Sequence, residues 1–408
     1  MEENYRKTLK ACYIGFITQA ILNNLAPLLF VVFQDWYDVS FEMLGRLILI
    51  NFMTQIVADL LAVKYASRLG YRTSAIIAHI CSVLGLVSLA ILPQTMPQPY
   101  IGLVISVMIY ALGGGIIEVL MSPIVESLPF DEKSSEMSLL HSFYCWGQVV
   151  VVLGTTLLLK IIGTQYWSLA PLLWAIIPLS NIYRFMKVPL MPLTDEENNM
   201  PLQKLFSSKV FIVALILMLC AGASELTMSQ WSSLFAEKGL QVSKVVGDLL
   251  GPCLFAVFMG IGRTIYGKLG DRINIERALL YSSILCIVCY LITALAINPF
   301  ISLIGCAICG LSVSLLWPGT ISLSSKRYPQ GGVMMFGLLA IFGDLGASIG
   351  PWMAGFISNI VQKFHVSEFS AVPIEQVALK TGILISVIFP IILLVGILVL
   401  KREKTTYE

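Results

Sequence analysis

Residues 187–209 read KVPLMPLTDEENNMPLQKLFSSK and form the only sizeable polar interruption in a chain of apolar runs. A transmembrane helix needs about 20 mostly apolar residues, and six runs of that kind lie on each side of the interruption. They are residues 9–34, 43–66, 73–93, 100–126, 136–162 and 166–186, then 208–236, 245–267, 276–297, 299–322, 331–362 and 378–400. The sequence therefore predicts twelve transmembrane helices, with residues 1–186 and 208–408 as two six-helix bundles and 187–207 as a linker.

The amino-acid composition supports a membrane protein. Hydrophobic residues make up 57% of the 408 residues and charged residues only 12%, whereas soluble domains carry roughly 25% charged residues. The net charge of +2 gives no reason to expect a nucleic-acid partner. The basic N-terminus leads into an apolar run that continues through Phe33 without a small-residue cleavage site. We therefore expect a retained first span and not a signal peptide.

The distribution of Lys and Arg indicates the orientation of the spans. With both termini in the cytoplasm, nineteen of these residues fall in cytoplasmic segments and six in outer segments. This excess follows the positive-inside rule, so we expect both termini and the linker to be cytoplasmic. No Asn-x-Ser/Thr site occurs, which fits a bacterial inner membrane. The lipid bilayer is the expected partner of the spans, and no protein partner can be read from the sequence.

Four of the nine cysteines have the spacing of a zinc site. They lie in CIVC (286–289) and CAIC (306–309), two pairs that are sixteen residues apart. Both pairs lie inside long apolar runs, and neither has a turn or a polar knuckle beside it. We therefore interpret them as small packing residues of membrane helices, and we expect no metal, cofactor or disulfide framework.

Two short basic turns occupy equivalent places in the two halves. VKYASRLGYR (63–72) follows the second span and GKLGDRINIER (267–277) follows the eighth. The segment GKLGDR resembles the loop signature Gly-x-Leu-x-Asp-Arg of the major facilitator superfamily, and the first copy has Ser67 at the Asp position. The resemblance implies a secondary transporter: an all-α membrane protein of two pseudo-symmetric six-helix bundles with a central cavity.

Shorter stretches resemble the fucose permease branch of that superfamily, the sugar–proton symporters. GGGIIEVLMSP (113–123) resembles the Gly-rich stretch, the Glu and the small-Pro pair of span 4 in this branch. Asn23, Asn24 and Leu25 match its span 1, but Pro27 stands where the branch has an acid. The resemblance implies transport of a sugar together with a proton.

Two later spans extend this resemblance. HSFYCWG (141–147) places His141 where the branch has a Gln in span 5. In span 7, Glu225 precedes Trp231 by six residues, as in related sequences. The resemblance implies that spans 1, 4, 7 and 10 line the cavity.

Glu118 lies about midway along an apolar run, where a carboxylate is costly. Even insertion scales give about 2.5–3.5 kcal/mol for a charged residue at the centre of a membrane helix. Such a group must face the bundle interior, find a partner or bind a proton, and desolvation favours the protonated form. Glu118 is therefore the candidate proton-coupling residue, with Glu225 as a second candidate. A packing role is the alternative, because three glycines before Glu118 permit close helix approach.

Other polar and aromatic residues of the spans are candidates for solute binding. Amides and acids can bind hydroxyl groups, and an indole can stack on the apolar face of a sugar ring. The candidates are Asn23, Asn24, Gln55, His141, Gln148, Trp231, Trp317 and Asp344. For each of them, helix packing is the alternative interpretation.

Charged residues near the cytoplasmic ends of the spans are candidates for a gate. Asp59 lies one helical turn after Gln55 and can pair with a basic residue of the following loop. The complete set of gate candidates is Asp59, Arg68, Gly267, Asp271 and Arg272. Arg263 lies within the eighth predicted span. We expect it to extend its guanidinium to the cytoplasmic surface, and pairing with an acid such as Asp344 is the alternative.

The expected function is secondary active transport of a small polar solute, with a sugar favoured, by alternating access and proton coupling through Glu118. No Walker nucleotide loop occurs, so an ion or solute gradient must supply the energy. Efflux of amphipathic compounds is an alternative, because the sequence does not set the direction. A non-transporting sensor is disfavoured by short cytoplasmic segments. A membrane enzyme is disfavoured because the spans contain no metal cluster or Ser–His pair.

Overall fold

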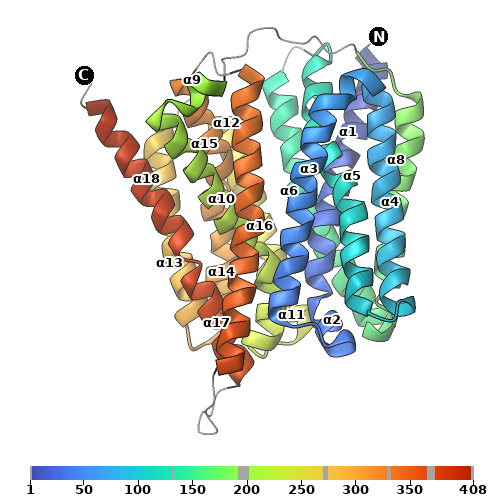
Figure 1. The fold of residues 1–408 in the computed structure, drawn as a ribbon, viewed down its shortest axis with the longest axis vertical. Helices are drawn as coiled ribbons and strands as arrows, with labels where there is room; N and C mark the ends of the chain where they lie inside the picture. Colours follow the sequence, from blue (N-terminus) through green and yellow to red (C-terminus); the bar gives the residue numbers. More distant parts are fainter. Residues whose placement is uncertain are drawn as a thin grey trace. The chain divides into compact units, whose positions relative to one another are not determined.

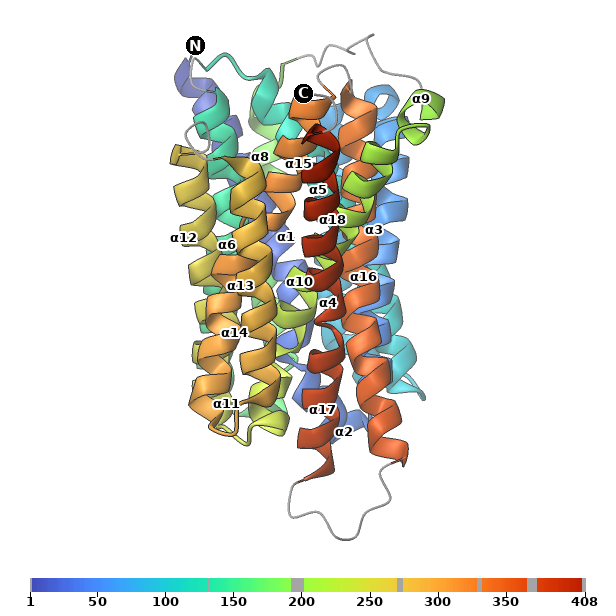
Figure 2. The same ribbon diagram turned by 90° about the vertical axis from the view of Figure 1, so that its left-hand side faces the viewer.

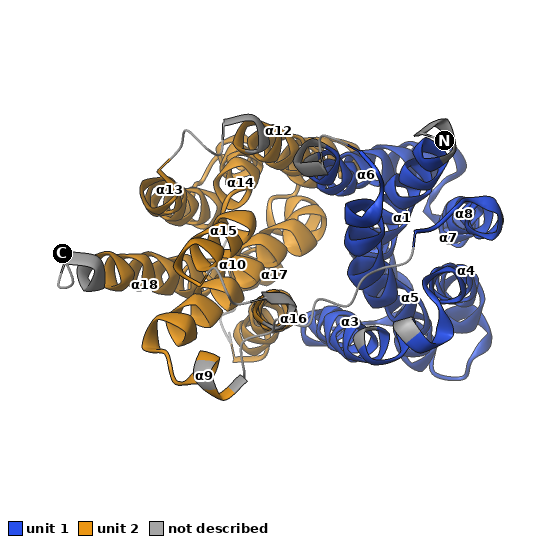
Figure 3. Ribbon diagram, turned by 90° about the horizontal axis from the view of Figure 1, so that it is seen from above, with its two compact units in different colours: residues 1–194 blue, residues 195–408 orange. Residues whose placement is uncertain are grey.

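The described part of the chain folds into helices. The computed structural model describes residues 2–130, 133–191, 202–269, 274–328, 332–364 and 373–405, and no strand occurs among them. Eleven helices are long and apolar enough to cross a membrane, and a bent helix pair at the N-terminal end raises the number to twelve when it is counted as one span. The predicted all-α fold with twelve spans is confirmed. The chain divides into two compact units, residues 1–194 and 195–408 (Figure 3).

Unit 1 contains the first six predicted spans. Its helices are α1 (Glu2–Leu28), α2 (Phe30–Tyr37), α3 (Phe41–Leu69), α4 (Tyr71–Thr95), α5 (Pro99–Ser127), α6 (Lys133–Ile162), the short 3-10 helix η1 (Thr164–Tyr166), α7 (Leu169–Trp174) and α8 (Ile176–Lys187). The long helices of this unit run side by side (Figure 1). α5 packs against α1, α3 and α4, while α1 also packs against α6 and α8. This arrangement makes α1 and α5 the inner helices of the unit.

The first span is bent at a proline. Its two parts, Tyr5–Leu28 and Phe30–Tyr37, meet at an angle of 43°. Pro27 lies inside the last turn of α1, and proline has no N–H to donate while its ring clashes with the preceding turn. The residue that replaces the acid of the resembled branch therefore breaks the helix here.

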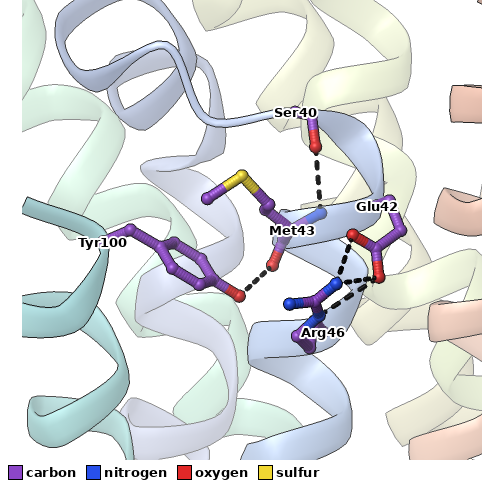
Figure 4. A network of polar contacts seen from close by, with 5 residues as sticks. All are labelled: Ser40, Glu42, Met43, Arg46 and Tyr100. Atoms are coloured by element: carbon purple, nitrogen blue, oxygen red, sulfur yellow. Dashed lines mark hydrogen bonds and ion pairs between the residues drawn. The ribbon is translucent and has the colours of Figure 1, made fainter.

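The first turn of α3 is fixed by its own polar residues (Figure 4). The Ser40 hydroxyl caps the helix and accepts a hydrogen bond from the backbone N–H of Met43 at 3.3 Å, a kind of cap typically worth about 1 kcal/mol. One Nη of Arg46 donates to both carboxylate oxygens of Glu42, at 2.7 and 2.8 Å. Tyr100, at the start of α5, donates its hydroxyl to the Met43 carbonyl at 3.0 Å and so ties α5 to α3.

Unit 2 contains the last six predicted spans. Its helices are α9 (Leu202–Phe206), α10 (Lys209–Leu234), the π-helical segment η2 (Phe235–Gly239), α11 (Lys244–Asp248), the π-helical segment η3 (Leu249–Cys253), α12 (Leu254–Leu269), α13 (Ile275–Leu295), α14 (Pro299–Val313), α15 (Leu316–Arg327), α16 (Gly332–Phe364), α17 (Ile374–Ile385) and α18 (Ile388–Thr405). α10 packs against α14, α15, α16 and α18. Figure 2 shows α12, α13 and α14 side by side.

Small residues bring α10 and α16 into backbone contact. A Cβ atom on Gly346 would lie 1.8 Å from the carbonyl oxygen of Leu219, and one on Gly222 would lie 2.1 Å from that of Gly343. No real side chain tolerates such distances, so only glycine fits at these crossings. Close helix approach through small residues is a common form of packing in membranes, where lipid removes the hydrophobic drive for association.

The outward faces of the helices are apolar. Leu157 and Ile161 on α6 are 58% and 73% exposed, and Leu179 on α8 is 55% exposed. A helix that faces water carries polar residues on this side, and large apolar patches are rare on soluble proteins. These faces fit the hydrocarbon core of a bilayer.

The cysteines of CIVC and CAIC are buried free thiols. They lie on α13 and α14, which pack against each other. Within the described ranges, no group of three or more His, Cys, Asp or Glu side chains is arranged to hold a metal ion. The two pairs fill space at a helix contact.

Candidate functional site

Polar side chains from three helices meet inside unit 1. α1 contributes Gln19 and Asn23, α3 contributes Asn51 and Gln55, and α5 contributes Glu118. Each of the four amide side chains is 5% exposed or less, and Glu118 is partly buried. We call these five residues the amide network. Buried polar groups are costly unless they are hydrogen-bonded, so their partners define what the network can do.

The network is a row of hydrogen bonds that ends at the carboxylate. Gln19 Nε2 donates to Glu118 Oε2 and to Gln55 Oε1, each at 2.9 Å. Gln55 Nε2 donates to Asn23 Oδ1 at 2.8 Å, and Asn51 Nδ2 donates to the same oxygen at 3.2 Å. One acidic group is thereby linked to amides on two other helices.

Each glycine of the Gly-rich stretch before Glu118 faces a different neighbour. A Cβ atom on Gly113 would lie 2.5 Å from a carbonyl oxygen of α4, and one on Gly115 would lie 2.6 Å from the Gln55 carbonyl oxygen. A Cβ atom on Gly114 would lie 3.2 Å from Gln19 Oε1. The stretch therefore lets α3 and α4 approach α5 and leaves room for the amides. Close helix packing and the polar network therefore occur at the same place, and the choice between coupling and packing for Glu118 stays a prediction.

Three further predicted solute contacts lie on α1 or on α6, which packs against α1. Asn24 on α1 donates to the carbonyl of Ala20 in its own helix at 2.9 Å. His141 on α6 is exposed and packs edge-on against Phe16 of α1, with 5.2 Å between ring centroids. Gln148, also on α6, is 1% exposed. Because α6 packs against α1, these residues lie on or next to the helix that carries half of the network amides, and their solute-binding role stays a prediction.

The predicted gate is described only in part. Asp59 on α3 is 7% exposed, and a Cβ atom on Gly115 of α5 would lie 2.7 Å from its Oδ1. Arg68 lies exposed in the last turn of α3. Asp271 and Arg272 lie outside the described residues, as do the surroundings of Gly267. The gate therefore stays a prediction.

The acid of α10 forms an ion pair with the arginine of α12. Arg263 Nη2 lies 3.0 and 3.2 Å from the two carboxylate oxygens of Glu225. Their side chains are 18% and 8% exposed. Arg263 therefore pairs with an acid, which was the alternative to an extended side chain, but the acid is Glu225 and not Asp344. Burying two opposite charges costs less free energy when they pair with each other, and Glu225 on α10 is close enough to pair with Arg263.

The predicted solute contacts Trp231, Trp317 and Asp344 of unit 2 are in contact with α16 or lie on it. Trp231 is 1% exposed, and its indole N–H donates to the carbonyl of Pro351 on α16 at 2.9 Å. Trp317 on α15 packs over Gly343, where a Cβ atom would lie 2.3 Å from the indole ring. Asp344, next to that glycine, is 3% exposed. A solute-binding role for these three residues stays a prediction.

Another buried carboxylate of unit 2, in addition to Glu225 and Asp344, was not anticipated from the sequence. Asp248 on α11 is fully buried and accepts a hydrogen bond from the Ser233 hydroxyl. Lys244 Nζ lies 3.2 Å from its Oδ2, one helical turn earlier. The signal was present, because Lys and Asp four residues apart inside an apolar run form a favourable pair on one helix face.

The sequence profile of the Major Facilitator Superfamily matches residues 11–351. The chain belongs to the major facilitator superfamily. Its members are membrane carriers, generally without enzymatic activity, so this chain is an integral membrane protein with a transporter fold. The expected family is confirmed over most of the sequence, including all six spans of unit 1 and much of unit 2.

Solved structures of this superfamily have the same fold. The E. coli fucose:proton symporter FucP is 18% identical, with a TM-score of 0.64 over 96% of this chain and 97% of that chain. A bacterial homologue of the human lysosomal transporter Spinster, in an inward-facing and occupied conformation, is 13% identical, with a TM-score of 0.74 over 98% of both chains. At these identities the likeness concerns the fold alone.

A curated relative matches over a shorter range. The multi-drug resistance efflux pump PmrA of Streptococcus pneumoniae is 32% identical over 120 residues, which is 29% of this chain. The match spans 29% of the length of that pump.

Two network residues of this superfamily member escaped the sequence analysis. Gln19 precedes Asn23 by four positions, and Asn51, Gln55 and Asp59 follow one another at the same interval. Four-residue spacing places side chains on one face of a helix. Polar residues at that spacing in two apolar runs indicate that each helix has a polar face, and that the two faces can meet. The sequence analysis recognised this spacing only for Gln55 and Asp59.

Proposed function

We propose that the protein is a secondary active transporter that carries a small polar solute by alternating access, with proton coupling through Glu118. A sugar is the favoured solute class. The observation that carries the proposal is the hydrogen bond from Gln19 to Glu118, which links a membrane-depth carboxyl to buried amides of two other helices. Amides both donate and accept hydrogen bonds, and this suits a solute rich in hydroxyl groups.

Because the hydrogen-bond partner of Glu118 is uncharged, we propose that a proton neutralises this carboxylate. Gln19 is neutral, so it can stabilise the carboxylate by a hydrogen bond but cannot balance its charge. A carboxyl in that position can bind a proton from one side of the membrane and release it on the other. Glu225 is in the opposite situation, because Arg263 balances its charge. We therefore assign coupling to Glu118 and a fixed ion pair to Glu225.

The membrane setting of the proposal follows from the charge distribution. The excess of Lys and Arg supports a protein with both termini in the cytoplasm, and the lack of an Asn-x-Ser/Thr site fits a bacterial inner membrane. Asp59, Arg68 and the segment GKLGDR would then act on the cytoplasmic side, where alternating access requires contacts that break and re-form.

Efflux of amphipathic compounds is the second candidate. The similarity of 120 residues to PmrA, which is named a multi-drug resistance efflux pump, favours it. Both candidates use the same fold and can both use a buried acid. They differ in the solute and in the direction of net movement, which an experiment can separate.

The test is proton movement in proteoliposomes. Wild type, Glu118→Gln and Glu126→Gln are reconstituted, and external pH is followed after addition of each sugar from a monosaccharide panel. Glu126 lies on the same helix two turns further and is exposed, so its substitution removes an equal charge outside the network. We expect alkalinisation with at least one sugar in wild type and Glu126→Gln, and none in Glu118→Gln.

Other outcomes decide between the alternatives. Persistent sugar exchange without proton movement in Glu118→Gln would separate coupling from binding. Wild-type vesicles that ignore every sugar but expel an amphipathic dye would overturn the sugar proposal in favour of efflux. Binding of a sugar without any turnover would indicate a sensor.

A further inference from the structure

We propose that Gln19 is a positioning residue that transmits the protonation state of Glu118 to Asn23 and Asn51. This inference rests on the proposed function, because it assumes that Glu118 binds and releases a proton. It adds a physical link between the coupling group and amides on two other helices.

The orientation of every amide in the network follows from the carboxylate. An ionised carboxylate only accepts hydrogen bonds, so Gln19 must turn its NH2 group toward it. The same nitrogen also donates to Gln55 Oε1, which obliges Gln55 to point its own NH2 group at Asn23. Asn23 Oδ1 then receives two donors, the second from Asn51.

This orientation leaves buried acceptors without donors. Gln19 Oε1 and Asn51 Oδ1, at the two ends of the amide row, are buried and have no hydrogen-bond partner. Buried acceptors without partners are rare and indicate an alternative arrangement or an absent ligand. Gln19 Oε1 belongs to the side chain that contacts Glu118, and it is the acceptor that a protonated Glu118 would need.

Protonation of Glu118 favours the reverse orientation of the whole row. A proton from the aqueous phase forms an O–H bond on the Glu118 carboxyl, which then becomes a donor. Rotation of the terminal amide of Gln19 by half a turn exchanges its oxygen and nitrogen and presents the oxygen to this donor. The oxygen would then face Gln55 Oε1, so Gln55 must rotate as well, followed by Asn23 and Asn51. No bond other than the O–H bond forms or breaks.

The result is a change in what Asn51 offers to a solute. In the orientation described, Asn51 uses its NH2 group within the network and has its oxygen available as an acceptor. In the reversed orientation, Asn51 accepts from Asn23 and has its NH2 group available as a donor. A solute hydroxyl therefore meets a different hydrogen-bonding group before and after protonation.

Other titratable groups surround α5 but are engaged elsewhere or lie on a different turn. Tyr13 of α1 donates to Glu136 of α6, and His79 of α4 is hydrogen-bonded to Ala75 and Asn181. Asp59 of α3 lies against Gly115, almost one turn from Glu118. Other Cys, Tyr, His and acidic residues in the middle and cytoplasmic halves of α5 and the helices packed against it include Cys12, Tyr13, Asp59, His79, Cys81, Tyr110, Glu126, Glu136, His141, Tyr144 and Cys145. Glu118 is the one that Gln19 contacts.

The test is infrared difference spectroscopy of reconstituted protein during a pH step, which needs no solute. In wild type we expect the carboxyl band of Glu118, identified by its loss in Glu118→Gln, together with bands from Asn and Gln side-chain amides. In Gln19→Leu we expect the carboxyl band to persist and the amide bands to be lost. Gln94→Leu, which removes an exposed amide of α4 that bonds only its own helix, should leave both sets of bands unchanged.

A second variant keeps the test decisive if Gln19→Leu does not fold. Gln19→Asn keeps a polar amide but is too short to reach both partners, so we expect the same loss of amide bands. Amide bands of wild-type size in either variant, with the carboxyl band present, would overturn the role of Gln19 and leave the proposed function standing. A wild-type spectrum without a Glu118 band would overturn both.

Discussion

The two units respond differently to the same physical problem, a carboxylate at membrane depth. In unit 1, Glu118 receives a hydrogen bond from the neutral amide of Gln19. In unit 2, Glu225 faces the guanidinium of Arg263 at 3.0 Å. A neutral amide cannot balance the charge of an ionised carboxyl, whereas a guanidinium can. On this difference rests our proposal that Glu118 carries a proton while Glu225 joins two helices.

The two basic turns, residues 63–72 and 267–277, allow equivalent positions of the two units to be compared. Aligning the two turns places Ser67 opposite Asp271, and the same register places Asp59 opposite Arg263. Unit 1 therefore has an acid where unit 2 has a base.

The largest effect is expected from removing the cation of unit 2. Arg263→Met leaves Glu225 buried without its counter-charge, and breaking a buried pair in this way costs about 3–5 kcal/mol. We expect a corresponding loss of thermal stability, measured in detergent by the reaction of a thiol-specific dye with the buried cysteines. The double variant Glu225→Gln/Arg263→Met should recover most of the loss. Equal instability of the single and double variants would show that the pair matters through packing and not through charge.

Glu118→Gln is the matched change in unit 1 and should be nearly neutral for stability. The substituted amide oxygen can still accept from Gln19, so the network stays intact and only the titrating group is lost. A melting temperature that falls as far as in Arg263→Met would contradict the comparison.

The second largest effect concerns the helix contacts. Gly346→Ala places a Cβ atom 1.8 Å from the Leu219 carbonyl oxygen, so α10 and α16 must separate. Overpacking of this kind costs about 1–3 kcal/mol and occasionally more. Gly337→Ala on the same helix is the control, because nothing lies within 4 Å of its Cβ position. Thermal melts of both variants should differ clearly, and equal melts would contradict the close contact.

Much of the fold could be predicted from the sequence, because the bilayer imposes a length and an apolar composition on every span. The polar segment 187–209 separates the two sets of six spans. The spans predicted over residues 43–66 and 100–126 lie close to the observed Phe41–Ala66 and Pro99–Ser127. The bend at Pro27 was not anticipated, since its effect depends on the packing of α1 and α2.

The site was harder to predict, because partners across helices depend on how the helices are rotated. Glu118 and Gln55 were identified as polar residues within spans, but the residue that joins them, Gln19, was not. Arg263 was expected at the surface because long side chains can reach it, and the sequence alone does not show that Glu225 lies nearer.

The next prediction compares neighbouring glycines of unit 1. Gly115→Ala would place a Cβ atom 2.6 Å from a backbone oxygen of α3, whereas in Gly114→Ala the nearest atom is Gln19 Oε1 at 3.2 Å, which can move. We expect Gly115→Ala to lose about 1–3 kcal/mol of stability and Gly114→Ala less than about 1 kcal/mol. Gly114→Ala should nevertheless change proton-coupled uptake, because it displaces Gln19. The reverse order of the two melting temperatures would contradict this role of the Gly-rich stretch.

The smallest effect is expected from Trp231→Phe. The change removes one hydrogen bond to the Pro351 carbonyl and keeps an aromatic ring, so the loss should be about 0.5–1.5 kcal/mol. The affinity for the transported solute should not change if Trp231 is a packing residue of unit 2. A large loss of affinity in titration calorimetry at unchanged stability would restore its predicted role in solute binding.

The contrast between the units requires that Glu118 titrates while Glu225 does not. The most direct measurement is the infrared carboxyl band of the reconstituted protein during a pH step, compared among wild type, Glu118→Gln and Glu225→Gln/Arg263→Gln. We predict that the band disappears in Glu118→Gln and persists in the double variant. A band that persists in Glu118→Gln and disappears in the double variant would contradict this, because the proton would then be carried by the acid of unit 2.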